Sequence, residues 1–244
     1  MEVKPEGQAT VAHSYSRGVD IFVTTAQSFG FNPSAMQISE WQDLLGAARL
    51  LDDLLDSDNP QLDRENAYDA HVSAMFEVPD DGASILNPSL FSTLRSHSER
   101  WSDGKAEKVR SLTANVRDIA STKRGLSSAR ELGTVALQEG TETARLFEID
   151  SPSSSAEQSF NTWLDSLLRF GVVIDTAFDL PEDYKNGLTL VSPTLLNRES
   201  VAFCGRADLI GLATKTPAKL YWMLVKAAGA VIDDVGKDAI LREK

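Results

Sequence analysis

Two groups of closely spaced aspartates are the residues of this chain best suited to chemistry. The first group is Asp52, Asp53 and Asp56, and the second is Asp175, Asp179 and Asp183. Each group lies within a long apolar stretch. An ionised carboxylate buried without a partner is so unfavourable that it pairs with a cation, takes up a proton or binds a metal ion. We interpret both groups as metal ligands.

The spacing within each group suits more than one ion. On a helix, Asp52 and Asp56 are one turn apart and share a face, while Asp53 lies about 100° round from Asp52 and can flank the same site. The second group repeats at i, i+4 and i+8, which gives a stripe of carboxylates about 12 Å long at about 1.5 Å per residue. Mg²⁺ prefers oxygen ligands and commonly links one or two carboxylates to substrate phosphates. Two facing stripes would therefore bind a diphosphate through Mg²⁺.

An alternative is that these acids form solvated helix faces, with Arg49 and Lys185 as nearby ion-pair partners. A solvated face does not require this spacing twice, so the two groups together favour metal. Apolar residues beside both groups would supply the walls of a cavity for a long hydrocarbon chain. They are Leu50, Leu51, Leu54 and Leu55 beside the first group, and Phe170, Val172, Val173, Ile174 and Phe178 beside the second.

The elements that carry these groups are predicted to be helices. Apolar residues recur at intervals of three and four over 35–56, 66–76, 88–101, 105–119, 127–147, 156–179, 201–213 and 217–235. Turn-forming segments separate them, and strand-like alternation is nearly absent. Ser155 is a plausible N-cap for the helix that carries the second aspartate group. The sequence predicts an all-α bundle and one domain spanning residues 1–244.

Composition excludes several classes of partner. The formal charge of −12 and the pI near 4.7 argue against nucleic acid or an anionic membrane as the main partner. No apolar run reaches membrane-spanning length, and the N-terminus lacks the form of a signal peptide, so we expect a soluble, cytoplasmic protein with no integral membrane segment. The single cysteine, Cys204, is expected to lie in the core. The apolar run 220–225 either pairs two copies as a homodimer or forms a buried helix.

Both aspartate groups resemble motifs of one protein family. The segment Arg49-Leu-Leu-Asp52-Asp53-Leu-Leu-Asp56 is similar to the first aspartate motif of the squalene/phytoene synthase family, and Asp179-Leu-Pro-Glu182-Asp183-Tyr-Lys-Asn-Gly187 is similar to the second. The segment 135–147 resembles the small-residue helix that lines the prenyl pocket of that family. The resemblance spans about residues 33–195.

The resemblance implies a class I isoprenoid synthase fold, an all-α bundle around a deep apolar cavity with Mg²⁺ at its mouth. It implies a prenyl diphosphate substrate of the farnesyl or geranylgeranyl class, whose ionisation gives an allylic carbocation. Carried over to this chain, Asp52, Asp56, Asp179 and Asp183 would be the catalytic metal ligands. Asp53 and Asp175 would be further metal ligands, with Asp175 at a position where the family often has asparagine.

The chain departs from the family pattern at two positions of the second motif. Gly187-Leu188 replaces the arginine that usually follows this motif, which argues against a reductive squalene-type second step. Pro181 falls within the motif and removes a helical N–H, so we expect a kink after Asp179 that would turn Asp183 away from the other acids. These departures favour a smaller cavity that holds one substrate.

Cations and aromatic rings near the motifs are candidates for substrate contacts. Arg49, Arg145 and Lys185 are candidate ligands of the substrate diphosphate, with Arg198 as a further cation. Trp41, Phe147, Phe170 and Phe178 are candidates for a cavity wall that stabilises carbocations, although core packing is the commoner role of such rings.

Three functions follow from this reading. The leading prediction is a Mg²⁺-dependent terpene synthase that acts on one prenyl diphosphate. The first alternative is a head-to-head prenyltransferase that condenses two prenyl diphosphates, as in squalene and phytoene synthases. The second is a catalytically silent helical partner of a prenyl synthase, in which Pro181 has disrupted the second metal site.

Overall fold

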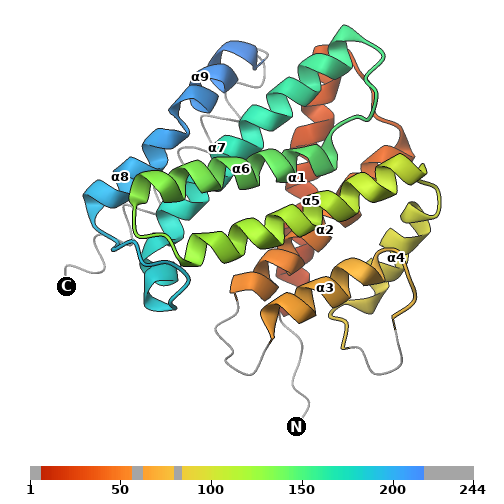
Figure 1. Cartoon of the computed structure of the whole chain (residues 1–244). Coiled ribbons are helices and arrows are strands. Elements are labelled where there is room, and N and C mark those ends of the chain that lie inside the picture. The colour runs from red at the N-terminus through yellow and green to blue at the C-terminus, as the bar shows by residue number, and fades with distance from the viewer. Residues whose placement is uncertain (1–6, 57–62, 80–83, 217–244) are drawn as a thin grey trace.

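A computed structural model describes residues 7–56, 63–79 and 84–216 of the chain. Within these residues the secondary structure is helical and contains no strand, which confirms the predicted all-α class (Figure 1). The helices are α1 (Gly7–Phe29), α2 (Ala35–Asp56), α3 (Arg64–Ala74), α4 (Pro88–Ser98), α5 (Asp103–Arg124), α6 (Ala129–Phe147), α7 (Ser155–Lys185), α8 (Leu195–Cys204) and α9 (Arg206–Lys215). None of the described helices is both long enough and apolar enough to cross a bilayer.

Local capping chemistry explains where several of these helices begin. α7 starts one residue earlier than expected, because its N-cap is Ser154 and not Ser155. The Ser154 hydroxyl accepts a hydrogen bond from the Glu157 N–H at 3.2 Å, and the Glu157 carboxylate accepts one from the Ser154 N–H at 3.0 Å. These two reciprocal hydrogen bonds form a capping box between Ser154 and Glu157, which fixes the start of α7.

The helix predicted over 201–213 is divided in two. α8 ends at Cys204 and α9 begins at Arg206, with Gly205 between them. A β-carbon at Gly205 would lie 3.2 Å from the ring of Phe170 and 3.3 Å from the side chain of Val173 on α7, so a small residue allows α8 and α9 to lie close to α7. The predicted helix 217–235, with its apolar run, lies outside the described residues.

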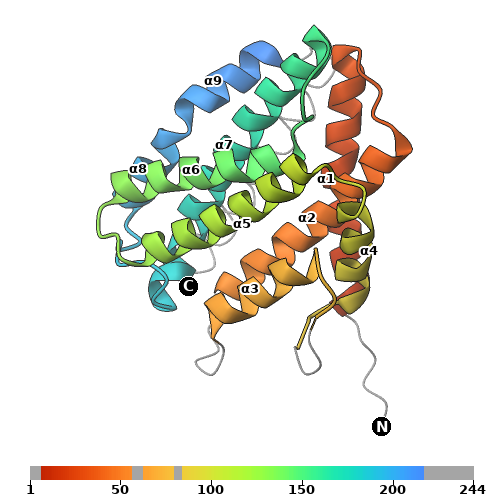
Figure 2. The ribbon, with the colours of Figure 1, turned by 45° about the vertical axis from the view of Figure 1, so that its right-hand side comes forward.

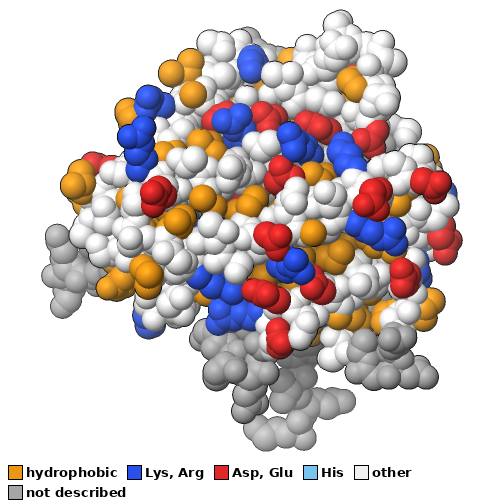
Figure 3. All heavy atoms as spheres, in the orientation of Figure 1, with side chains coloured by type: hydrophobic (Ala, Val, Ile, Leu, Met, Phe, Trp, Pro, Cys, Tyr) orange, Lys and Arg blue, Asp and Glu red, His pale blue; other side chains and the backbone are white. Residues whose placement is uncertain are grey.

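The helices form a bundle with α6 near its middle. α6 packs most extensively on α7 and also on α5 and α8, while α1 and α2 pack together and α1 contacts α7 (Figures 1 and 2). The main core includes a run of aromatic rings: Phe22 meets Trp41 edge to face, and Trp41 stacks on Phe160 at 5.4 Å. On the face seen in Figure 3, acidic and basic side chains are interspersed, without a continuous basic patch.

The contact between α6 and α7 depends on Gly140. A β-carbon there would lie 2.5 Å from the Cα and 2.9 Å from the N of Arg169, and 2.9 Å from the carbonyl oxygen of Leu168. These are backbone atoms of α7 and cannot rotate away as a side chain could. The absence of a side chain at Gly140 therefore sets how closely α7 approaches α6.

Replacing Gly140 with alanine should force the two helices apart. We expect Gly140→Ala to lower the free energy of unfolding by about 2 kcal/mol or more, as overpacked core substitutions do. The matched control is Gly171→Ala on α7, where a β-carbon would meet nothing within 4 Å. That substitution should stabilise the protein by about 0.5–1 kcal/mol, because alanine is the better helix former. Urea unfolding of both variants gives the comparison, and equal effects would contradict this role of Gly140.

Candidate functional site

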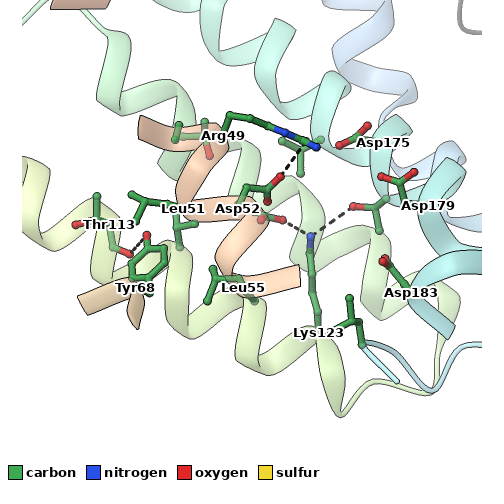
Figure 4. A pocket seen from close by; sticks show the side chains of 18 of the residues that line it. Arg49, Leu51, Asp52, Leu55, Tyr68, Thr113, Lys123, Asp175, Asp179 and Asp183 are labelled. Atoms are coloured by element: carbon green, nitrogen blue, oxygen red, sulfur yellow. Dashed lines mark hydrogen bonds and ion pairs between the residues drawn. The ribbon is translucent and has the colours of Figure 1, made fainter. Parts of the chain in front are cut away.

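A cavity of about 430 Å³ lies between α2, α5, α6 and α7, with Tyr68 of α3 also in its wall (Figure 4). This volume is within the range of small-molecule sites. The lining residues are Leu45, Ala48, Arg49, Leu51, Asp52, Leu55, Tyr68, Thr113, Val116, Ala120, Lys123, Arg124, Leu132, Glu139, Thr143, Leu146, Val172, Asp175, Thr176, Asp179, Asp183, Leu188 and Thr189. The lining is therefore mixed, and the deep apolar cavity implied by the family resemblance stays a prediction.

The structure brings members of both aspartate groups to this one cavity. Asp52 lines it from α2, and Asp175, Asp179 and Asp183 line it from successive turns of α7, as Figure 4 shows. Asp175 and Asp179 are exposed, and Asp52 and Asp183 are partly exposed, so the acids are open to solvent. Asp53 does not line the cavity and is exposed beside Arg49. Asp56 is the last residue of α2, and its side chain lies outside the described part of the structure.

Three cationic side chains line the same cavity. Arg49 is half exposed, and its guanidinium lies 3.3 Å from the carboxylate of Asp52 and 3.0 Å from that of Asp53. Lys123, near the end of α5, forms an ion pair with Glu139 of α6, and its ammonium lies 3.4 Å from the Thr176 hydroxyl. Arg124 donates to the Leu55 carbonyl at 3.1 Å, one of the last carbonyls of α2, which have no partner within that helix.

The other predicted cations are not brought to the cavity. Arg145 is half exposed on α6 and pairs with Glu142 at 3.0 Å. Lys185 is exposed at the end of α7 and is not a lining residue. Arg198, on α8, donates a hydrogen bond from its Nε to the Ala177 carbonyl at 3.0 Å and lies over the ring of Phe178.

The bond from Arg198 is explained by Pro181. Proline has no N–H, so the carbonyl four residues earlier, that of Ala177, receives no helical hydrogen bond from it. The Arg198 guanidinium supplies that carbonyl with a donor, and α7 continues through Pro181 to Lys185. Asp183 lines the same cavity as Asp175 and Asp179, so Pro181 does not turn it away as expected.

Gly187 ends α7 and directs the chain back to the cavity. Gly187 has a φ of +71°, a conformation that glycine adopts without strain. The Leu188 N–H bonds to the Asp183 carbonyl at 2.8 Å and the Gly187 N–H to the Tyr184 carbonyl at 3.3 Å, the two bonds of a Schellman motif. Leu188 and Thr189 are thereby placed in the cavity wall. Glycine, and not the family's arginine, suits this turn.

The aromatic residue in the cavity wall is one that the sequence did not single out. Tyr68 is buried, and its hydroxyl donates to the Thr113 carbonyl at 2.8 Å. Burial raises the pKa of its phenol, so it remains a neutral donor. Trp41 and Phe147 instead lie in the main core, joined by a 3.0 Å hydrogen bond from the indole to the Phe147 carbonyl. Phe170 and Phe178 do not line the cavity either.

The small residues of α6 also have a different role from the expected one. Gly140 faces α7, and Gly133 faces α8, where a β-carbon would lie 2.6 Å from the Cys204 sulfur. The cavity is instead lined from α6 by Leu132, Glu139, Thr143 and Leu146. The small residues therefore set helix packing, and larger residues on another part of the helix line the cavity.

The charge of the lining is unfavourable for an anion. Five carboxylates and three cations line the cavity, a formal charge of −2. Desolvation by the surrounding helices raises the pKa of Asp175, while Arg49 and Lys123 lower it. The residue is itself exposed at the cavity edge, so solvent weakens these effects. A diphosphate entering this cavity needs additional positive charge.

The donor set fits a hard divalent cation that is only partly held by protein. Among the described residues no three acidic, histidine or cysteine side chains lie close enough to hold one metal ion. Mg²⁺ commonly takes one or two carboxylates and completes its shell with water and substrate phosphates. Asp52 on one side, and Asp175, Asp179 and Asp183 on the other, offer oxygen ligands of that kind. The residues present therefore fit Mg²⁺ bound together with an anionic substrate.

Comparison with known proteins gives no relative: no protein family model, curated protein or solved structure matches this chain. The family resemblance of the two motifs thus stays a prediction. Sequence reasoning missed Lys123, Glu139, Thr176 and Tyr68 as cavity residues. A signal was present for Glu139, a charged residue among small and apolar ones in the segment 135–140, but none marked Lys123 or Tyr68.

The role assigned to Arg198 can be tested with a double-mutant cycle. Arg198→Met should lower the free energy of unfolding by about 1–3 kcal/mol, because it leaves the buried Ala177 carbonyl without this donor. In a Pro181→Ala background the new N–H at position 181 can bond to that carbonyl, so the same substitution should cost about 1 kcal/mol less. Urea unfolding of the four proteins measures this coupling. Additive effects within about 0.5 kcal/mol would rule out the compensation.

Proposed function

We propose that this protein is a Mg²⁺-dependent enzyme that ionises an allylic prenyl diphosphate of the farnesyl or geranylgeranyl class and forms a terpene from it. The observation that supports this most is the position of Asp52 and of the Asp175, Asp179 and Asp183 stripe. These acids come from helices far apart in the sequence, belong to the two groups of closely spaced aspartates, and line one cavity of substrate size. If the two groups were only solvated helix faces, their meeting at one cavity would not be expected.

The acids have a direct role in this proposal. Asp52 on α2 and Asp175, Asp179 and Asp183 on α7 would hold Mg²⁺ together with the substrate diphosphate. When bound, Mg²⁺ supplies the positive charge that a departing diphosphate requires. Arg49 at the cavity edge adds a further positive charge beside Asp52.

The apolar part of the lining would take the hydrocarbon chain. Leucines from α2 and α6, with Leu188 after α7, form a surface that can bury a prenyl chain and exclude water from it. The buried ring of Tyr68 lies in the same lining, where its face can stabilise a nearby cation. Its hydroxyl donates a hydrogen bond to the Thr113 carbonyl, so it is not oriented to attack a carbocation as a nucleophile.

One prenyl chain fits this cavity better than two. A cavity of about 430 Å³ lies at the low end of the range for small-molecule sites. The turn at Gly187 stands where the squalene/phytoene synthase family has an arginine. Both features favour a single-substrate terpene synthase over head-to-head condensation, which is the alternative product outcome for the same site.

Substitution of single aspartates tests the proposal. We expect Asp52→Asn and Asp179→Asn each to slow the release of inorganic diphosphate from farnesyl or geranylgeranyl diphosphate by more than about a hundredfold. Charge stabilisation by a metal contributes several kcal/mol, and about 1.4 kcal/mol is a factor of ten in rate. Chelation of Mg²⁺ should abolish release by the wild-type enzyme.

The matched control is Glu182→Gln, which removes an exposed carboxylate from α7 between Asp179 and Asp183 but outside the cavity lining. This variant should keep the wild-type rate. Circular dichroism of all three variants checks that the helices are intact. Equal rates in wild-type protein, Asp52→Asn and Asp179→Asn would reject the proposed metal site.

A further inference from the structure

We propose that Lys123 binds the substrate diphosphate directly and that Glu139 is the positioning residue that holds its ammonium in the cavity. This inference rests on the proposed function and adds to it a site residue that belongs to neither aspartate motif. Lys123 comes from α5 and Glu139 from α6, and both line the cavity. They form an ion pair with each other, and Lys123 lies 3.4 Å from the Thr176 hydroxyl on α7.

The pair is largely withdrawn from solvent. The Lys123 side chain is 19% exposed and that of Glu139 is 10% exposed. Removing two charges from water is costly, and a buried ion pair is often no more stabilising than apolar residues of the same volume. The contribution of this pair to the stability of the fold is therefore expected to be small. Binding of an anion in the cavity would explain why a shielded ammonium lies there.

The Lys123 ammonium lies between the two sides of the cavity that carry the proposed metal ligands, Asp52 on α2 and the aspartates of α7. Figure 4 shows the Lys123 side chain rising through the cavity, with its nitrogen between Asp52 of α2 and Asp179 of α7. A diphosphate bound through Mg²⁺ by both walls would lie between these same residues. The position of Lys123 thus matches the position that the proposed metal ligands require of the substrate.

The other two cavity cations are less suited to this role. Arg49 is half exposed and is engaged by both Asp52 and Asp53. Arg124 donates to the last turn of α2 through the Leu55 carbonyl. Lys123 combines shielding from water with a flexible stem and an ammonium that has three N–H donors, so it can turn toward a phosphate oxygen while it keeps its ion pair with Glu139.

Inorganic diphosphate (pyrophosphate) is a probe that separates this inference from turnover. Calorimetric titration with pyrophosphate, in buffer with saturating Mg²⁺, measures the affinity of the site without any reaction. Lys123→Met should weaken binding by about tenfold to a hundredfold, since hydrogen bonds to charged groups contribute about 1.5–3 kcal/mol. Glu139→Gln keeps a hydrogen-bond acceptor but removes a negative charge, so it should tighten binding by about threefold or more.

Lys108→Met is the matched control. Lys108 is also on α5 and pairs with a carboxylate on another segment, Asp150, at 2.8 Å, but it does not line the cavity. Its loss should leave pyrophosphate affinity unchanged while removing a more exposed ion pair from the same helix. Lys123→Gln, which keeps a donor for Glu139, is the second variant if Lys123→Met does not fold.

Two results would overturn the inference. Pyrophosphate affinity of Lys123→Met equal to that of wild-type protein and Lys108→Met would show that Lys123 only ties α5 to α6. Wild-type protein that binds no pyrophosphate with Mg²⁺ would remove the anion site altogether. If the wild-type protein turns over a prenyl diphosphate but Lys123→Met binds pyrophosphate as tightly as wild type, only the role of Lys123 is rejected. If pyrophosphate binds through Lys123 but no prenyl diphosphate is turned over, only the proposed enzymatic function is rejected.

Discussion

The balance of charge around one cavity is the constraint on which the rest of this structure depends. Carboxylates from α2, α6 and α7 line the same space and repel one another, and three cations only partly offset them. Lys123 is paired with Glu139 within that space, and Arg49 with Asp52 at its edge. The remaining negative charge is solvated at the cavity edge but would repel an anionic ligand, so the proposed diphosphate site requires a divalent cation.

The path of α7 decides whether its acids reach the cavity. Gly140 lets the helix approach α6 closely, and the bond from Arg198 to the Ala177 carbonyl allows it to continue through Pro181. Gly187 then ends the helix in a turn that returns Leu188 to the cavity wall. Residues that touch no ligand thus hold the stripe of Asp175, Asp179 and Asp183 in place.

Much of this could be predicted from local sequence. The 3.6-residue period and the turn residues predicted the observed bounds of α2, Ala35–Asp56. The spacing of the aspartates selected four acids that share a cavity, although Asp53 does not line it. Residues brought in by distant packing could not be foreseen. Lys123, Glu139 and Tyr68 look like ordinary helical positions until α3, α5 and α6 are placed around α2 and α7. The close approach of Gly205 to Phe170 and Val173 of α7 is likewise a result of distant packing.

The most direct test of the central claim is mass spectrometry of the products formed from geranyl, farnesyl and geranylgeranyl diphosphates, with Mg²⁺ and with a chelator. The proposed function predicts a hydrocarbon or alcohol with the carbon count of its substrate, formed only when Mg²⁺ is present. A product of doubled carbon count would establish head-to-head condensation at the same site. No product from any of these substrates would contradict the proposed activity and favour a catalytically silent helical protein.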